Sequence, residues 1–317
     1  MDFSAILDDA KFQIEEFKTK YPDWIVVIRW ATATWKSRLS VELSQFFPME
    51  VISSDSRQIF RKMDIGTDKI AQEIREKIPH YQIDIVNPDE IYTAWERKDD
   101  ADKEIEDILT RGKYPFIVWW TGLYIDTIYR NYSMPECPPN YVLRKELEEK
   151  EAHTPWILHH ELSKIDPAEA QKLHPNSVRY IIRALEIYYG TWRTKTEGYV
   201  QQPVAHPLLM LGLWRDKETT NQLINARIKE MFKNWLIEEV DGLLKDGYSP
   251  SLQSMQGIWY KEVVRYLQWE YNYDKMEELL KRDTHHLAKK QRTWFRRYIA
   301  EGMQTPKENV CYKVWSL

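Results

Sequence analysis

Glycine is scarce in this chain, whereas tryptophan is abundant. Ten glycines among 317 residues make about 3 %, less than half of the roughly 7 % that is typical of proteins, and there are 14 tryptophans. Several tryptophans stand where the local pattern favours a small residue: Trp30, Trp35, Trp119, Trp120, Trp192 and Trp259. Ordinary core packing accounts for Trp24, Trp294 and Trp315 instead.

Cysteine and long apolar runs are also nearly absent. Cys137 and Cys311 are the only cysteines, which excludes a disulfide framework and a Cys2His2 zinc finger and favours a reducing cytoplasm. No apolar run approaches the roughly 18 residues of a membrane span, and the acidic start of the chain is not typical of a signal peptide. We therefore expect a cytoplasmic protein that does not enter a membrane.

Residues 30–37 have the spacing of a phosphate-binding loop, Gly-x-x-x-x-Gly-Lys-Ser, with tryptophan at both glycine positions. The apolar residues 26–28 before it predict a buried strand, and the apolar spacing after Lys36 predicts a helix. Lys36 would neutralise phosphate oxygens and Ser37 would ligate Mg²⁺. The alternative, a chance Lys-Ser pair at a helix start, is disfavoured by this strand-loop-helix context.

Buried strands alternate with helices along the chain. We expect strands at 26–28, 49–53, 81–86, 114–118 and 208–213, and helices between them and on to about residue 304. This alternation predicts an α/β fold, a P-loop NTPase-like parallel sheet flanked by helices, with ligands at the carboxyl ends of the strands.

A change of composition interrupts this pattern near Asn131. Residues 133–139 are rich in proline, and the charged stretch after them to about Gln202 reads as helical. We therefore expect a helical insertion domain at 131–204 within a core made of 1–130 and 205–317.

Two polar groups follow predicted strands. Asp55 comes directly after the second strand, where a carboxylate could act as a general base or bind magnesium, or could cap a helix. Thr121 follows the strand at 114–118, so its hydroxyl would face the same cleft. That strand carries no acidic residue at its end, which argues against an ATP-driven kinase or hydrolase.

Two groups of basic residues could contact nucleic acid, although a net charge of −4 excludes a uniformly basic surface. Arg179 and Arg183 are four residues apart and would share a helix face. Near the carboxyl terminus, basic residues alternate with aromatic ones, a mixture suited to phosphates and unstacked bases. The basic residues there are Lys289, Lys290, Arg292, Arg296 and Arg297. The alternative interpretation is that each group of basic residues simply forms a solvent-exposed helix face.

Together these segments resemble the tRNA dimethylallyltransferases, also called tRNA isopentenyltransferases, over about residues 24–300. The family loop Gly-Pro-Thr-x-x-Gly-Lys-Ser is similar to 30–37, and its Asp-Ser-x-Gln…Asp-Ile-Gly-Thr-x-Lys signature is similar to 52–69. Segments 79–90, 118–125, 174–186 and 256–262 resemble further family motifs in the same order. The family pattern has glycine where this chain has Trp30, Trp35, Trp119, Trp120 and Trp259.

The resemblance implies a Mg²⁺-dependent transfer of a dimethylallyl group from dimethylallyl diphosphate to N6 of the adenosine 3′ of the anticodon. The diphosphate would lie in the loop formed by Thr32, Ala33, Thr34, Trp35, Lys36 and Ser37. Asp55 would accept the N6 proton or hold the amine, with Thr121 and Lys36 also catalytic. Ser56, Arg57 and Gln58 would contact the tRNA, as would Arg179, Arg183 and the carboxyl-terminal basic residues, with the helical insertion clamping the anticodon stem. We expect a monomer.

Tryptophan at glycine positions departs from the family pattern. The bulk of Trp35 and of Trp119-Trp120 would crowd the diphosphate, so we expect weak diphosphate binding and slow turnover. Three other functions stay open: an adenylate isopentenyltransferase acting on AMP, ADP or ATP, a catalytically impaired tRNA-binding protein of this family, and a small-molecule P-loop kinase.

Overall fold

A six-stranded sheet forms the core of the protein. The computed structural model describes residues 2–29, 36–118, 121–304 and 309–317. The strand order is β3–β2–β4–β1–β7–β8, and every neighbouring pair is parallel. The strands are β1 (Ile25–Arg29), β2 (Met49–Ser53), β3 (His80–Tyr81), β4 (Tyr114–Val118), β7 (Leu208–Trp214) and β8 (Val310–Ser316). The predicted parallel α/β sheet is confirmed.

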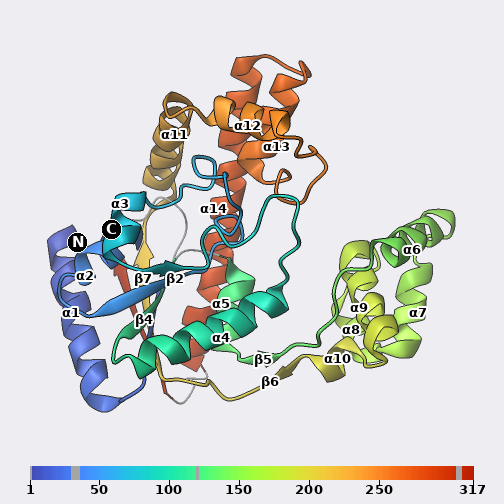
Figure 1. The fold of residues 1–317 in the computed structure, drawn as a ribbon. Helices are drawn as coiled ribbons and strands as arrows, with labels where there is room; N and C mark the ends of the chain where they lie inside the picture. The colour runs from blue at the N-terminus through green and yellow to red at the C-terminus, as the bar shows by residue number, and fades with distance from the viewer. Residues whose placement is uncertain (1, 30–35, 119–120, 305–308) are drawn as a thin grey trace. The chain divides into compact units, whose positions relative to one another are not determined.

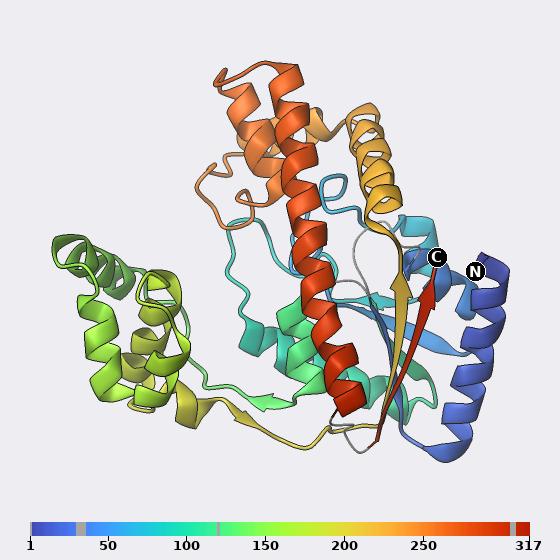
Figure 2. The ribbon, with the colours of Figure 1, turned by 180° about the vertical axis from the view of Figure 1, so that it is seen from behind.

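Helices pack on this sheet and on one another, and α12 and α13 lie at the end of α14 that is far from the strands (Figures 1 and 2). Helix α4 packs on β2 and β4, α1 packs on α2 and β7, and the long α14 contacts α11, α13 and β8. The helices of this part are α1 (Phe3–Lys20), α2 (Lys36–Leu43), α3 (Gln72–Lys77), α4 (Ala94–Thr110), α5 (Gly122–Tyr129), α11 (Lys217–Lys233), α12 (Leu236–Lys245), α13 (Ile258–Leu267) and α14 (Tyr273–Gln304).

Strands β1 and β2 are buried along their whole length, which explains their continuous apolar sequences. All five residues of β1 and of β2 are buried, as strands covered on both faces of a parallel sheet must be. Buried Arg29 ends β1, where its guanidinium donates to the Phe295 carbonyl oxygen at 3.3 Å and lies 4.9 Å from the Tyr298 ring centroid. These contacts tie α14 to the centre of the sheet.

Residues 126–205 form a second compact unit, separate from the unit made of 1–125 and 206–317. The expected insertion was 131–204. The unit begins within α5. It contains a short antiparallel pair, β5 (Tyr132–Ser133) with β6 (Val200–Gln201), and the helices α6 (Tyr141–His153), α7 (Ile157–Ile165), α8 (Pro167–Lys172), α9 (Val178–Thr191) and α10 (Lys195–Gly198). Leucines, isoleucines and alanines of α6–α9 make its core.

One expected strand was wrong in its extent, and one strand of the sheet was missed. The segment expected as a strand at 81–86 pairs as β3 at His80–Tyr81 only, followed by a single bridge between Phe60 and Val86. The carboxyl-terminal strand β8 was not expected at all, although it pairs with β7 over seven residues. Within the described ranges, none of the helices combines the length and apolar character needed to cross a bilayer.

Candidate active site

Two cations and two carboxylates influence one another at the start of α2. Lys36 is 7 % exposed, and burial lowers its pKa to about 7, helped by the charge of Arg227 and opposed by the charges of Asp68 and Asp55. Arg227, on α11, forms an ion pair with Asp68 at 2.8 Å. The rest of the predicted loop, Thr32 to Trp35, lies outside the described residues, as do Trp30, Trp119 and Trp120. Lys36 and Arg227 thus lie near enough for Arg227 to disfavour the charged form of Lys36, and an anionic ligand would offset that repulsion.

Asp55 and Thr121 come together at the ends of β2 and β4. One Asp55 carboxylate oxygen accepts the backbone N–H of Arg57 at 2.8 Å, so the carboxylate closes a turn instead of capping a helix. The Ser56 backbone N–H donates to Thr121 Oγ1 at 2.9 Å, which joins the two strand ends. Burial raises the pKa of Asp55, against the opposing effects of the Arg57 hydrogen bond and the nearby Arg57, Arg227 and Lys36 charges. Asp55 is therefore a stronger base than an exposed aspartate.

Gln58 holds the turn that follows β2. Its side chain is fully buried, with the Ser53 hydroxyl donating to Oε1 at 3.0 Å. Its amide nitrogen donates to the carbonyl oxygens of Thr67 and Asp68 at 3.2 and 3.1 Å. Every polar atom of the side chain is thus engaged within the protein. The expected contact between Gln58 and the target adenosine stays a prediction.

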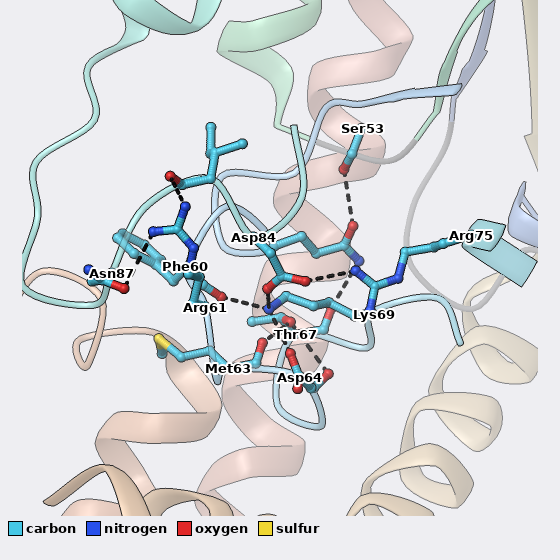
Figure 3. Close-up of polar contacts among 12 residues, drawn as sticks. Ser53, Phe60, Arg61, Met63, Asp64, Thr67, Lys69, Arg75, Asp84 and Asn87 are labelled. Carbon is cyan, nitrogen blue, oxygen red and sulfur yellow. Dashed lines mark hydrogen bonds and ion pairs between the residues drawn. The ribbon is translucent and has the colours of Figure 1, made fainter. Parts of the chain in front are cut away.

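Lys69 anchors the loop that carries Asp68, as Figure 3 shows. Its buried ammonium donates to the Phe60 carbonyl oxygen at 2.6 Å and to the carboxylates of Asp64 and Asp84 at 2.7 and 2.5 Å. Arg75 meets the other oxygen of Asp84 at 2.7 Å. Lys69 and Asp84 belong to the two family-like segments 52–69 and 79–90, and here their role is to fold one segment onto the other.

A carboxylate from α12 holds the same loop from its other side. Glu239 accepts the backbone N–H groups of Asp64, Ile65 and Gly66 at 2.8, 2.7 and 3.1 Å, and the Tyr260 hydroxyl at 2.6 Å. A Cβ at Gly66 would lie 2.6 Å from the Tyr260 ring, so glycine lets the ring approach. This clamp fixes the loop on which Asp68 meets Arg227.

The predicted basic residues of α14 are accessible. Lys289, Lys290, Arg296 and Arg297 are exposed, whereas Arg292 is half-buried. The Arg297 guanidinium lies 4.0 Å from the ring centroid of Trp294, and Trp294 packs against Gly122 at the start of α5. This helix therefore presents cations and an aromatic ring in the unit that contains Asp55 and Thr121.

In the second unit the two predicted arginines have different surroundings. Arg179 is exposed. Arg183 donates to Glu186 at 2.5 Å and to the Cys137 carbonyl oxygen at 2.9 Å, and Glu186 also accepts two hydrogen bonds from Arg144, at 2.8 Å each. Arg183 has an internal structural role, and tRNA contacts of both arginines stay predictions.

Sequence reasoning missed three residues of this region: Asp68, Arg227 and Glu239. Arg227 did carry a signal, because Ile224, Ile228 and Met231 give α11 a buried face and Arg227 interrupts that face with a charge. Asp68 and Glu239 carried no such signal, since the sequence around them does not distinguish them from surface carboxylates.

The described residues do not by themselves form a complete metal site. They contain no cluster of three or more His, Cys, Asp or Glu side chains that could hold an ion. Mg²⁺ keeps waters and substrate phosphate oxygens among its ligands, so one hydroxyl such as that of half-buried Ser37 is a reasonable protein contribution.

Comparison with known proteins connects this arrangement to one family. The IPP transferase family model matches residues 58–298. A tRNA dimethylallyltransferase from Pelotomaculum thermopropionicum is 42 % identical over 276 residues, covering 86 % of this chain and 88 % of the relative. The corresponding protein of Thermotoga maritima is 40 % identical over 274 residues, with 86 % and 90 % covered.

Solved structures agree with these sequence relatives. The tRNA isopentenylpyrophosphate transferase of Bacillus halodurans superposes with a TM-score of 0.65 at 35 % identity, covering 93 % of this chain and 90 % of that one. A eukaryotic dimethylallyltransferase acting on tRNA gives a TM-score of 0.74 at 27 % identity, covering 92 % and 74 %. With the sheet, the loop spacing and the ordered motifs all in agreement, the chain belongs to the IPP transferase family and has its P-loop NTPase-like fold.

Proposed function

We propose that this protein transfers a dimethylallyl group from dimethylallyl diphosphate to N6 of the adenosine 3′ of the anticodon in tRNA. The observation that carries the proposal is that Lys36 and Arg227 lie close enough to the half-buried carboxylate of Asp55 to influence its charge, and that the neighbouring Ser56 N–H donates to Thr121. The family relatives, named for the same reaction, support it.

The transfer reaction forms one covalent bond and breaks another. The N6 lone pair attacks C1 of the dimethylallyl group, the C1–O bond breaks, and pyrophosphate leaves with its electron pair. Lys36, Arg227 and the loop amides would stabilise the charge that develops on the leaving group. Asp55 would take the N6 proton, because burial raises its pKa and one of its carboxylate oxygens accepts no hydrogen bond from the described residues. Thr121 Oγ1 accepts the Ser56 N–H, so its own hydrogen can orient the amine or the diphosphate.

We propose Mg²⁺ as the ion that accompanies the diphosphate, with Ser37 as a protein ligand. It would supply further charge neutralisation of the leaving pyrophosphate. The polynucleotide substrate would be an anticodon stem-loop, with its target base extruded and its backbone held by the basic residues of α14 and of the 126–205 unit. We place the reaction in the cytoplasm and propose a monomer as the working form.

Replacement of Asp55 tests the proposed base. Asp55→Asn keeps the shape of the side chain but removes its basicity, so single-turnover prenylation of an anticodon stem-loop should slow by about 10²- to 10⁴-fold with unchanged stem-loop affinity. Asp89→Asn, at an exposed carboxylate in a turn, is the matched control and should leave the rate unaltered. Equal rates for Asp55→Asn and the unaltered chain would refute the role of Asp55.

Tryptophan at the loop positions is expected to limit this reaction. Titration with dimethylallyl diphosphate and Mg²⁺ should show weak binding by the chain as it stands, and tighter binding and faster turnover after combined replacement of Trp30, Trp35, Trp119 and Trp120 by glycine. Identical affinities and rates would contradict the expectation. Competition between AMP and a stem-loop as acceptors tests the substrate class, and preferential prenylation of AMP would overturn the tRNA assignment.

A further inference from the structure

Four tryptophans have a backbone conformation that suits glycine. The φ angles of Trp156, Trp192, Trp235 and Trp269 are 69°, 55°, 73° and 63°. In this left-handed region the Cβ atom of an L-residue crowds the following carbonyl oxygen, so a bulky side chain is a rare outlier there. Among the non-glycine residues described with positive φ, tryptophan is as frequent as aspartate and asparagine together, the residues that tolerate the region best.

The loop after α13 shows what the chain uses this conformation for. Trp269 N–H donates to the Tyr266 carbonyl oxygen at 2.9 Å, and Glu270 N–H donates to that of Arg265 at 3.1 Å. These two bonds define the Schellman motif, in which the residue after the helix cap is left-handed and is usually glycine.

Two glycines of this chain form the same motif and allow a direct comparison with Trp269. After α4, Gly112 (φ 69°) and Lys113 donate to Leu109 and Ile108 at 2.9 and 3.1 Å. After α12, Gly247 (φ 92°) and Tyr248 donate to Leu244 and Leu243 at 3.1 Å each. Trp269 therefore occupies the place that glycine occupies in the chain's own equivalent loops.

Trp192 and Trp235 also follow helices. Trp192 N–H donates to the Tyr188 carbonyl oxygen at 2.7 Å, the single bond of the simpler left-handed helix end. Trp235 N–H, directly after α11 and its cap Asn234, donates to the Phe232 carbonyl oxygen at 3.3 Å. Trp156 has the same conformation in the loop between α6 and α7.

The side chains of these four tryptophans give little reason for an indole. They are 61 %, 76 %, 67 % and 92 % exposed in chain order. Trp156 donates to Asn176 at 3.0 Å, and Trp192 makes one edge contact with Tyr188. By contrast, Trp24 is 0 % exposed and stacks on Tyr114, and Trp315 is 3 % exposed and donates to Asp9 at 2.8 Å. Trp24 and Trp315 are thus held by packing, whereas the four left-handed tryptophans are exposed.

A second set of tryptophan positions also indicates an exchange of glycine for tryptophan. The motifs quoted above have glycine where this chain has Trp30, Trp35, Trp119, Trp120 and Trp259. Of these five only Trp259 is among the described residues, and it lies in α13. The argument from motif spacing therefore concerns other positions than the argument from backbone geometry. Together, the two sets of positions also account for the low glycine content and high tryptophan content of the chain.

We propose that these nine positions are glycine positions, and that the protein made in its own organism carries glycine at each of them because the codon there is UGA, decoded as glycine. Genetic codes differ in reading UGA as stop, tryptophan or glycine, so a single codon gives rise to tryptophan under one code and to glycine under another. The packed tryptophans, Trp24, Trp294 and Trp315, would be encoded by UGG and would be tryptophan in both cases.

Peptide mass spectrometry of the protein isolated from its organism tests this directly, without reference to any activity. Fragment masses should place glycine at positions 156, 192, 235 and 269, and tryptophan at positions 24 and 315. Tryptophan at the four left-handed positions would overturn the proposal. Because this readout does not involve prenylation, its result is independent of the proposed function.

Unfolding of the recombinant chain tests the structural basis. Trp235→Gly and Trp269→Gly should each raise the ratio of folded to unfolded protein by roughly fivefold, because relief of left-handed strain exceeds the added freedom of the unfolded chain. Trp24→Gly, the matched control at a packed site, should lower that ratio by roughly a hundredfold or more. If Trp235→Gly and Trp269→Gly destabilise the protein or leave it unchanged, these are not glycine positions.

Discussion

Burial of Lys36 couples its protonation to the binding of an anionic ligand. Since its pKa falls to about 7, the folded protein releases this proton well before the unfolded chain does, whose lysine has a pKa of 10.5. Above about pH 7 the unfolded state therefore binds more protons, and this residue makes the free energy of unfolding rise with pH up to about 10.5. Bound diphosphate should reverse the shift, because its negative charge favours the ammonium.

The affinity for dimethylallyl diphosphate should consequently depend on pH. Between about pH 7 and about pH 9 binding must take up a proton at Lys36, so affinity should fall by up to roughly tenfold per pH unit. Titration calorimetry across this range measures the slope. Lys36→Arg, which stays charged throughout, should show a flatter profile. The same slope in both proteins would show that Lys36 is not the group that titrates.

At the scale of elements, two close approaches hold helices in place. A Cβ at Gly122 would lie 2.5 Å from the Trp294 indole nitrogen, so glycine at the start of α5 lets α14 pack closely. Gly66 allows the corresponding approach of Tyr260 from α13. Both glycines stand in family-like motifs, and their contacts give a packing reason for their presence.

Gly122→Ala should destabilise the protein by about 1–3 kcal/mol, since the added methyl group displaces a large ring. Gly242→Ala is the matched control, because Gly242 lies inside α12 with nothing within 4 Å of its Cβ position, and it should stabilise by about 0.5–1 kcal/mol. Urea unfolding of the two variants measures the difference. Equal effects would show that the Trp294 contact does not constrain position 122.

The Glu239 clamp belongs to the same scale. Glu239→Gln retains the size of the side chain but replaces one acceptor oxygen by a donor, leaving backbone N–H groups of the 64–66 loop without a partner. The free energy of unfolding should fall by about 1–3 kcal/mol, and diphosphate binding should weaken because the loop carries the Asp68 partner of Arg227. Glu238→Gln, one residue away on the same helix, is the control. Unchanged stability and binding in Glu239→Gln would rule out the clamp.

At the scale of the whole molecule, the proposed catalytic residues and the two predicted tRNA-binding arginines lie in different units. The sheet, Lys36, Asp55 and Thr121 belong to the unit of 1–125 and 206–317, and Arg179 and Arg183 belong to the unit of 126–205. The two arginines lie on one helix but differ in surroundings. Replacing each of them in turn therefore distinguishes an effect on tRNA binding from an effect on stability.

Arg179→Ala should weaken binding of an anticodon stem-loop and reduce the slope of log affinity against log salt by about one, without changing stability. Arg183→Ala should instead lower the free energy of unfolding by about 1–3 kcal/mol, because Glu186 loses one of its two cationic partners. Filter binding at several salt concentrations and thermal unfolding distinguish the two. A reversed pattern would reassign the contact to Arg183.

The sequence by itself determined the parallel α/β core, the helical interruption and the positions of Lys36, Asp55 and Thr121, because apolar periodicity and motif spacing are local properties of the chain. Only the tertiary structure decided that Arg227 meets Asp68 and that Glu239 holds the 64–66 loop, since each contact joins residues more than 150 positions apart. It also decided the pairing of β8 and the burial of Gln58. Burial and ion pairing depend on where the folded chain brings distant segments together, and local patterns of side chains do not specify those contacts.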